Sequence, residues 1–505
     1  MSETKPNDTK PAATGEIVLP KLTVSLTMPD AEAKPAADGK PDKVETQHTI
    51  TLGGQPLAYT ATAGRLTLRD DDGKERAKLY YTSYIRDDVP DTTARPILFA
   101  FNGGPGSSSV WLHLGCWGPR KVVLGAEGEQ PAPPPKLADN EQTLLDVADL
   151  VFIDPVGTGY SKAADGVEPK EFWSVEGDLD SVGDFIARFV TEHKRWASPV
   201  FVGGESYGTL RSAGLSQVLQ ERHGLYLSGV VLVSVVLNMA TIRFAPGNDL
   251  PYVLFLPSYC ATAWYHQALS PELQARPLRE LLDEVERFCH DEYAPALMWG
   301  DRLSRERFEA IRDRVAAYSG LSAEYVEASR LRIGMGRFNK ELLRDRGRTV
   351  GRLDSRYIGI DREQVRDSYE YDPSHTALHG AFAGALNQYL RAELGYEADV
   401  RYQIMAGLYM SWGYDKWANQ YCDVSEPLRE AMTHNPNLRV FCANGYYDLA
   451  TPYFATEYTF DHLALDPTLR DHVQMAYYEA GHMMYVKQSE LEQMAADVRA
   501  FIAGS

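Results

Sequence analysis

The chain has 505 residues, of which 44% are hydrophobic and 24% charged, a balance typical of a globular enzyme with roughly two to four structural units. Its formal net charge of −19 argues against nucleic acids and anionic membrane surfaces as partners, because phosphate groups repel an acidic chain. The longest apolar run, near Val230–Leu237, is too short to span a membrane and suits a buried strand.

The N-terminal segment 1–45 is rich in Pro, Lys, Asp, Ala and Thr. This composition predicts a mostly disordered tail with one short strand at Glu16–Met28. The segment contains no apolar stretch of the kind found in secretory signals, which favours a cytoplasmic location and leaves open an exported form whose signal was removed.

The cysteines are few and widely spaced, and none of them form a CxxC pair. Neither a zinc site nor a disulfide framework is therefore predicted, and we expect buried thiols in a reducing compartment. The five residues are Cys116, Cys260, Cys289, Cys422 and Cys442.

After the tail, strand patterns give way to an alternation of buried strands and helices. The first strands are expected at Thr46–Leu52, Leu57–Leu68 and Lys78–Ile85, with a hairpin turn at Asp70–Gly73. Strands buried on both faces are expected at Pro96–Asn102, Asp149–Asp154, Pro199–Gly203 and Leu227–Leu237, and helices at Val175–His193 and Glu205–Glu221. This alternation predicts an α/β fold with a mostly parallel central sheet.

A long region without buried strands, 238–408, predicts a helical cap inserted into the sheet domain. Its helical patterns are Leu273–Tyr293, Arg305–Tyr318, Ala323–Arg332 and Gly380–Glu393. The sheet is expected to resume with Leu438–Ala443 and His472–Tyr478, followed by a helix at Ser489–Ile502. The predicted organisation is a first core part at 46–237, the cap at 238–408 and a second core part at 409–505.

The segment Gly204-Glu205-Ser206-Tyr207-Gly208 has the form G-x-S-x-G. It lies between a predicted strand and a predicted helix, where this motif exposes a nucleophilic serine in a strained turn. An ordinary glycine-rich turn is the alternative interpretation, and it does not account for this placement. Ser206 is therefore the candidate nucleophile.

A serine hydroxyl needs an adjacent base, and in this fold an acid and a histidine follow the serine along the chain. Asp448 follows the predicted strand 438–443, and His482 follows the predicted strand 472–478. His462 and His472 are the rival histidines, but they lie on a helix and at a strand start, where a histidine more often packs or faces solvent.

A second glycine-rich segment, Asn102-Gly103-Gly104-Pro105-Gly106-Ser107-Ser108-Ser109, follows the strand at 96–102. Glycines let backbone N–H groups face a ligand, and an oxyanion hole takes one donor from such a loop and one from the residue after the nucleophile. A phosphate-binding loop is the alternative, but the Lys-Ser/Thr ending and the G-x-G-x-x-G spacing are absent.

Together with Asp154–Ser161 (DPVGTGYS), these motifs resemble the serine carboxypeptidase family, peptidase family S10, over about residues 75–240 and 410–500. The resemblance implies an α/β-hydrolase fold with Ser206 as nucleophile, His482 as base and Asp448 as the acid that orients it. It also implies an oxyanion hole at the backbone N–H groups of Gly104 and Tyr207. The substrate's C-terminal carboxylate would be held by Asn102, the Gly103 N–H and Glu205.

Two positions depart from the family pattern. Ser107 stands where family members usually carry a cysteine, so the disulfide that this cysteine often makes is absent. Counting on from Asn102, the family's second carboxylate-binding glutamate falls on Cys116. We therefore expect an altered exopeptidase site.

The predicted function is the release of C-terminal residues from peptides through an acyl-enzyme, without a metal or an organic cofactor. An esterase or an acyltransferase using the same three residues is the alternative enzyme. A catalytically inactive binding protein is the alternative of a different class. The sequence does not indicate the side-chain preference, the biological substrate or the oligomeric state.

Overall fold

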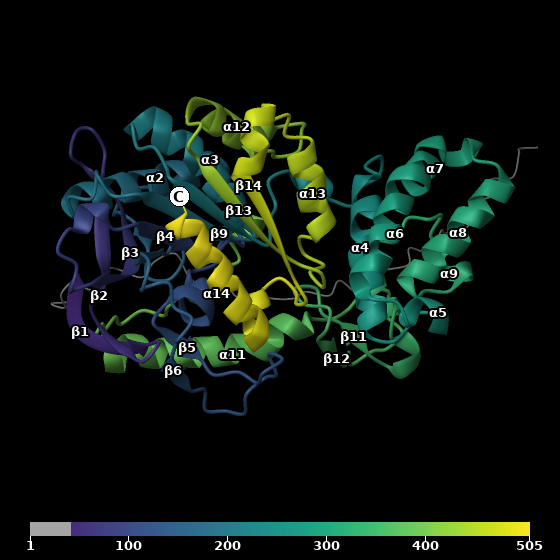
Figure 1. Cartoon of the computed structure of the whole chain (residues 1–505), viewed down its shortest axis with the longest axis horizontal. Helices are drawn as coiled ribbons and strands as arrows, with labels where there is room; N and C mark the ends of the chain where they lie inside the picture. Colours follow the sequence, from purple (N-terminus) through teal and green to yellow (C-terminus); the bar gives the residue numbers. More distant parts are fainter. Residues whose placement is uncertain (1–41, 505) are drawn as a thin grey trace, which may run out of the picture. The chain divides into compact units, whose positions relative to one another are not determined.

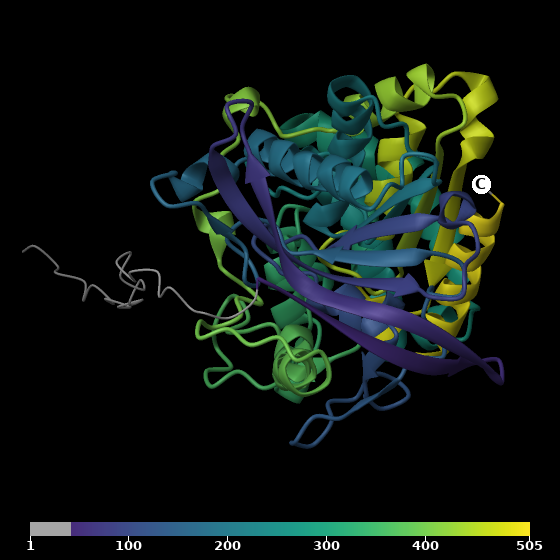
Figure 2. The same ribbon diagram turned by 90° about the vertical axis from the view of Figure 1, so that its left-hand side faces the viewer.

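The computed structural model describes residues 42–504 (Figures 1 and 2). The predicted disorder of the tail and the short strand at Glu16–Met28 fall outside the described residues. Strand β1 (Lys43–Leu52) nevertheless begins inside the segment 1–45. In residues 42–504, no helix is both long and apolar enough to cross a membrane.

A sheet of ten strands lies at the centre of the described part, in the order β1-β2-β3-β7-β4-β9-β10-β13-β14, with β8 (Lys162–Ala163) paired to β3. The antiparallel strands are β1, β2 (Gln55–Arg69) and β3 (Glu75–Arg86), which lie at one edge (Figure 2). The parallel strands are β7 (Asp149–Ile153), β4 (Ile97–Phe101), β9 (Val200–Glu205), β10 (Gly229–Val233), β13 (Arg439–Gly445) and β14 (Val473–Tyr478). This arrangement confirms the predicted α/β class.

Side chains along the parallel strands alternate between two hydrophobic cores, one on each face. In β4, Leu98 and Ala100 point into one core, and Ile97 and Phe99 into the other. The first core is covered by α11 (Pro373–Gln388) and α14 (Gln488–Ala503), and the second by α2 (Val175–Glu192), α3 (Tyr207–His223) and α12 (Ser425–His434). Burial on both faces explains the continuous apolar runs of the sequence.

The helices of the region 238–408 pack in two different hydrophobic cores. Helices α4 to α10 share a third hydrophobic core that includes Tyr453 and Phe454 of α13 (Tyr453–Asp461), and α4 to α9 form a separate group of ribbons in Figure 1. By contrast, α11 contributes Leu378 and Phe382 to the core under the sheet. The bounds of this group are α4 (Leu250–Tyr265), α5 (Pro271–Gln274), α6 (Leu278–Phe288), α7 (Ala294–Trp299), α8 (Arg305–Ser319), α9 (Ala323–Ala328) and α10 (Met335–Glu341). The domain bounds given above stay a prediction.

Several helices differ from the predicted ranges. The helix expected at Leu273–Tyr293 is interrupted, because α6 starts anew after Pro277 and continues into a π-helical turn, Cys289–Tyr293. The 16 residues of α4 were not predicted to be helical: they are mostly apolar around the helix and contain Pro257, so they lack the amphipathic stripe of a surface helix. Helix α11 begins at Pro373, before the predicted start at Gly380.

The described part also has short helices and strands outside the sheet and the long helices. They are α1 (Val110–Leu112), β5 (Arg120–Val122), β6 (Leu137–Asp139), β11 (Thr349–Val350) and β12 (Ile358–Gly359). All five cysteines are buried free thiols, as expected. The reducing compartment that they favour stays a prediction.

Candidate active site

Ser206 lies in the sharp turn between β9 and α3. Its backbone has φ 61° and ψ −128°, a conformation that residues other than glycine rarely adopt. Its N–H donates to the carbonyl of Val233 at the end of β10, over 2.9 Å. The predicted helix start at Glu205 is wrong, because Glu205 ends β9 and the positive φ of Ser206 separates the strand from a helix that begins at Tyr207.

The glycines of this turn are required by close backbone contacts. A Cβ added at Gly204 would lie 2.0 Å from the carbonyl oxygen of Gly208, and one added at Gly208 would lie 3.0 Å from that of Phe101. A Cβ at Gly103 would lie 2.4 Å from the nitrogen of Tyr207. The loop after β4 is therefore packed directly against the serine turn.

We predict that Gly204→Ala destabilises the fold by about 1–3 kcal/mol and removes activity, because the added methyl group must displace backbone. Gly380→Ala is the matched control: Gly380 lies within α11, and a Cβ there meets nothing within 4 Å. Alanine in a helix interior should be neutral or stabilising by up to ~1 kcal/mol. Urea denaturation of both variants checks this, and equal stability of the two would contradict it.

The two predicted donors of the oxyanion hole, Gly104 and Tyr207, belong to the two segments that meet here. Tyr207 is the first residue of α3, and the N–H groups of the first helical turn have no acceptor within their own helix. Gly104 follows Gly103 with φ 107°, a conformation that favours glycine. The structure thus brings the segment Gly103–Gly104 and the start of α3 together.

Asp448 and His482 are joined by a hydrogen bond. Asp448 lies in the loop after β13, is fully buried, and accepts from His482 Nδ1 at Oδ2 over 2.7 Å. The same oxygen accepts from the Thr451 hydroxyl over 2.7 Å, and Oδ1 accepts the N–H groups of Ala450 (2.7 Å) and Thr451 (3.0 Å). These bonds fix the carboxylate, and they leave Nε2 of the imidazole as the nitrogen that can accept a proton.

The loop that carries His482 is also hydrogen-bonded to the residue that follows β10. The Ser234 hydroxyl donates to the carbonyl of His482 over 2.6 Å, and the preceding residue, Val233, accepts the N–H of Ser206. Two adjacent residues therefore hold the serine turn and the histidine loop. Neither rival histidine has such contacts: His462 is exposed and bonds to the Tyr458 carbonyl, and His472 lies ahead of β14.

The environment of His482 favours its protonated form. Burial by itself lowers the pKa of this imidazole, but the charge and hydrogen bond of Asp448, with the charge of Glu205, raise the pKa above the ordinary value. The imidazole is therefore a strong base once it is deprotonated.

Asn102 sits at the carboxyl end of β4 with its side chain buried. Its Oδ1 accepts the N–H of Leu112 over 3.1 Å, and its carbonyl accepts from Arg211 over 2.8 Å. The amide Nδ2 is buried without a hydrogen bond of ordinary geometry. Because Oδ1 is occupied, the free donor of this amide is fixed in direction and faces the neighbourhood of Glu205, whose pKa it lowers.

Glu205, immediately before Ser206, is a buried carboxyl. Burial raises its pKa to about 7, although His482, the Tyr485 hydroxyl and Asn102 act in the opposite direction. The Tyr485 hydroxyl donates to Oε2 of Glu205. This carboxyl can therefore be protonated near neutral pH, and a protonated carboxyl is a hydrogen-bond donor.

A model of the serine carboxypeptidase family matches residues 54–499 of this chain. The chain belongs to the serine carboxypeptidase family. The match spans the sheet from β2 to β14, the inserted helices and both parts of the candidate active site, well beyond the motifs that carried the resemblance.

Individual family members align over shorter stretches. Serine carboxypeptidase-like 45 of Arabidopsis thaliana is 25% identical over 264 residues, which cover 48% of this chain and 53% of that protein. Pheromone-processing carboxypeptidase KEX1 of Saccharomyces cerevisiae is 29% identical over 156 residues, or 29% of this chain and 20% of that protein. The chain thus spans about half, or less, of these relatives' length.

A crystal structure of KEX1(delta)p, described as a prohormone-processing carboxypeptidase from Saccharomyces cerevisiae, superimposes with a TM-score of 0.53. It covers 88% of this chain and 91% of that one at 15% identity. The likeness shows a common fold, and it confirms the α/β-hydrolase fold that the motifs imply.

The two family departures occupy buried positions. Ser107 accepts from the Trp111 indole over 3.1 Å and donates to the Ser108 carbonyl over 2.9 Å, so it is bonded within its own loop. Cys116 lies in the π-helical turn His113–Trp117, fully buried, and burial with the nearby charge of Glu205 raises its thiol pKa well above the ordinary value. The thiol therefore stays protonated beside Glu205.

The family motif Asp154–Ser161 supports the loop after β4. Asp154 accepts both the N–H and the hydroxyl of Ser109 over 2.9 Å, and its other oxygen accepts from Tyr402 over 2.7 Å. A Cβ at Gly159 would lie 1.7 Å from this carboxylate. The motif thus fixes the far end of the loop that begins at Asn102.

A segment between β11 and α11, not singled out from the sequence, contacts both the loop that carries Asp448 and the loop that carries His482. The carbonyl of Leu353 accepts the N–H of His482 over 2.6 Å, and that of Arg352 accepts the N–H of Leu449 over 3.1 Å. Asp354 accepts the N–H of Gly481 over 3.1 Å and pairs with the buried Arg356. The contacts with His482, Leu449 and Gly481 each join residues more than 90 positions apart in the sequence, so no local pattern predicts them.

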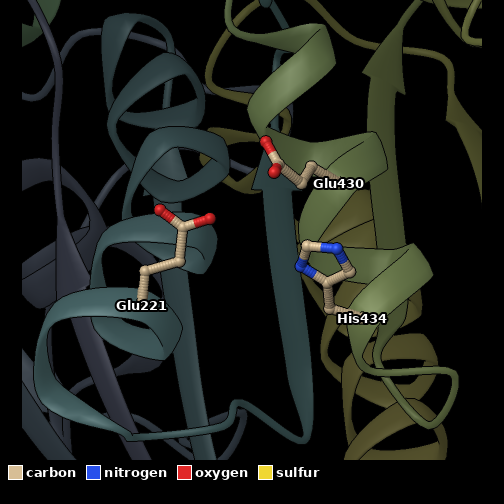
Figure 3. Close-up of side chains that lie close together, drawn as sticks. All are labelled: Glu221, Glu430 and His434. Atoms are coloured by element: carbon tan, nitrogen blue, oxygen red, sulfur yellow. The ribbon is translucent and has the colours of Figure 1, made fainter.

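One group of described side chains could together approach a cation: Glu221, Glu430 and His434, whose ligand atoms lie within 4.8 Å of one another (Figure 3). Glu430 already accepts from Gln217 over 2.7 Å. Glu221 is 15 residues beyond Ser206 on α3, roughly 22 Å at the rise of an α-helix. The group is mostly exposed, and acidic side chains often gather without an ion, so we assign it no role.

Proposed function

We propose that this chain is a serine carboxypeptidase that removes C-terminal residues from peptides through an acyl-enzyme. The observation that carries the proposal is the position of Glu205 and Asn102: a carboxyl that can be protonated, and an amide donor held in direction by the bond to its Oδ1, lie directly beside Ser206. Together with the Gly103 N–H, they form a set of donors suited to a carboxylate. A peptide presents such a group next to its last peptide bond only at its C-terminus.

In the proposed reaction, Ser206 attacks the last peptide carbonyl while Nε2 of His482 takes the hydroxyl proton. Asp448 holds Nδ1 and stabilises the imidazolium that forms. The oxyanion is stabilised by the N–H groups of Gly104 and Tyr207. His482 then protonates the leaving amino acid and afterwards activates the water that hydrolyses the acyl-enzyme.

The test compares one peptide with a free and with an amidated C-terminus. We expect kcat/KM for the amidated peptide to be lower by at least about tenfold, because amidation removes the charge that the donors at Asn102, Gly103 and Glu205 bind. Mass spectrometry of the products should show loss of single residues from the free end.

Equal rates on the two peptides, or cuts within the chain, would contradict the proposal. An ester cleaved efficiently while neither peptide is cleaved would point to an esterase, and transfer of the acyl group to an added amine or alcohol in preference to water would point to an acyltransferase. Labelling of Ser206 by a fluorophosphonate separates all of these enzymes from an inactive binding protein.

A further inference from the structure

Tyr485 is a buried side chain whose hydroxyl meets the candidate carboxylate site. It lies three residues after His482, in the turn Met484–Val486, with 2% of its surface exposed. Its ring packs on Gly115, where an added Cβ would lie 2.6 Å from the ring edge. The hydroxyl donates to Oε2 of Glu205. The absence of a side chain at Gly115 thus makes room for this ring.

The residue that the family resemblance places opposite Glu205 cannot act as a second carboxyl. Cys116 is a fully buried, protonated thiol, and a thiol is only a weak hydrogen-bond donor. The hydroxyl of Tyr485, in contrast, is a full donor and already contacts Glu205. The ring and the thiol come from the two elements, the turn 484–486 and the turn 113–117, that pack beside Glu205.

We propose that Tyr485 is the positioning residue for terminal-carboxylate recognition in this chain, taking the place of the family's second glutamate by donating to Oε2 of Glu205. This inference rests on the proposed carboxypeptidase function. Tyr485 acts through Glu205: its bond occupies Oε2 and leaves the other oxygen, Oε1, for the substrate.

The hydrogen bond determines which oxygen of Glu205 carries its proton. A protonated carboxyl has one O–H, and the oxygen that accepts from Tyr485 serves as the carbonyl oxygen. The proton is therefore placed on Oε1, from which it can be donated to the substrate's carboxylate. Since burial keeps the phenol pKa well above the ordinary value, Tyr485 does not titrate, and recognition depends on one proton, that of Glu205.

The pH dependence follows from the groups around Glu205. These are His482 and Asp448 from the catalytic loops, Cys116 and Tyr485 from the two turns, and Asn102 from the end of β4. The Tyr485 hydrogen bond stabilises the carboxylate form, so removing the hydroxyl should raise the pKa of Glu205 above about 7. The rise of KM with pH should then begin at a higher pH.

The experiment is Tyr485→Phe, measured as kcat and KM from pH 5 to 9 on the same peptide with a free and with an amidated C-terminus. We expect the selectivity for the free peptide to fall roughly 3- to 10-fold below pH 6, which corresponds to the loss of one hydrogen bond. The loss should appear mainly in KM. KM should still rise at alkaline pH with the slope expected for the loss of one proton, but the rise should begin at a higher pH than in wild type.

Tyr478→Phe is the matched control, because Tyr478 is also buried and its hydroxyl also donates to a carboxylate, that of Asp497, over 2.8 Å. It should leave the selectivity and the pH profile unchanged. If wild type prefers the free peptide and Tyr485→Phe has the same selectivity and the same alkaline limb, the inference is wrong and the function stands. If wild type itself does not distinguish the two peptides, the proposed function fails.

Discussion

Ser206→Ala should lower kcat by about 10⁴- to 10⁶-fold while the protein stays folded and still binds peptide. Alanine removes the hydroxyl that forms the acyl-enzyme in the proposed reaction, and it leaves the proposed oxyanion donors in place. His482→Ala should have nearly the same effect, because serine and histidine act as one unit. The rates are measured on a free-ended peptide at saturating concentration.

Ser216→Ala controls for the loss of a buried hydroxyl from the helix that follows Ser206. Ser216 is buried in α3, and its hydroxyl donates only to the Ala213 carbonyl, over 2.6 Å. This variant should keep kcat within about twofold of wild type, as expected for a residue away from the chemistry. Wild-type activity in Ser206→Ala would contradict the proposed roles. A double variant, Ser206→Ala with His482→Ala, that is far less active than either single variant would also contradict them.

Those parts of the fold that depend on local patterns could be predicted from the sequence. The buried strands β4, β7 and β9 appear as continuous apolar runs, because helices cover both of their faces. The serine turn could be recognised because a Cβ at either of its two glycines would lie only 2.0 or 3.0 Å from a backbone oxygen, so both positions need glycine and the motif is visible in the sequence. Helix α4 could not be predicted from its pattern, because it is buried on nearly all sides and its apolar residues therefore do not recur with the period of an amphipathic helix.

The candidate site was only partly predictable for a different reason. Asp448 and His482 could be placed because each follows a recognisable strand, and the fold dictates their order. Tyr485 and the segment Arg352–Asp354 follow no such rule. Their contacts with Glu205, His482 and Leu449 join residues that are distant in sequence, so only the folded chain brings them together.

Asp448→Asn should lower kcat by about 10⁴-fold, and the reason lies in the bonds of this carboxylate. The amide oxygen can still accept the N–H groups of Ala450 and Thr451, as Oδ1 does now. The amide NH₂ then stands where Oδ2 accepts from His482 Nδ1. Since two donors cannot face each other, Nδ1 must lose its hydrogen and Nε2 must carry it. This tautomer cannot take the proton of Ser206.

The pH profile distinguishes this mechanism from a simple loss of structure. Burial lowers the pKa of His482 and Asp448 raises it, so removal of the carboxylate's charge should lower that pKa. The imidazole must be neutral to act as base, and kcat is lost as pH falls through its pKa. For Asp448→Asn, the fall of kcat toward acid pH should therefore occur at lower pH than in wild type. The highest kcat that the variant reaches should also be lower. Asp461→Asn, an exposed substitution on α13, should change neither the plateau nor the limb. A plateau within tenfold of wild type for Asp448→Asn would show that the tautomer of His482 is fixed by another group.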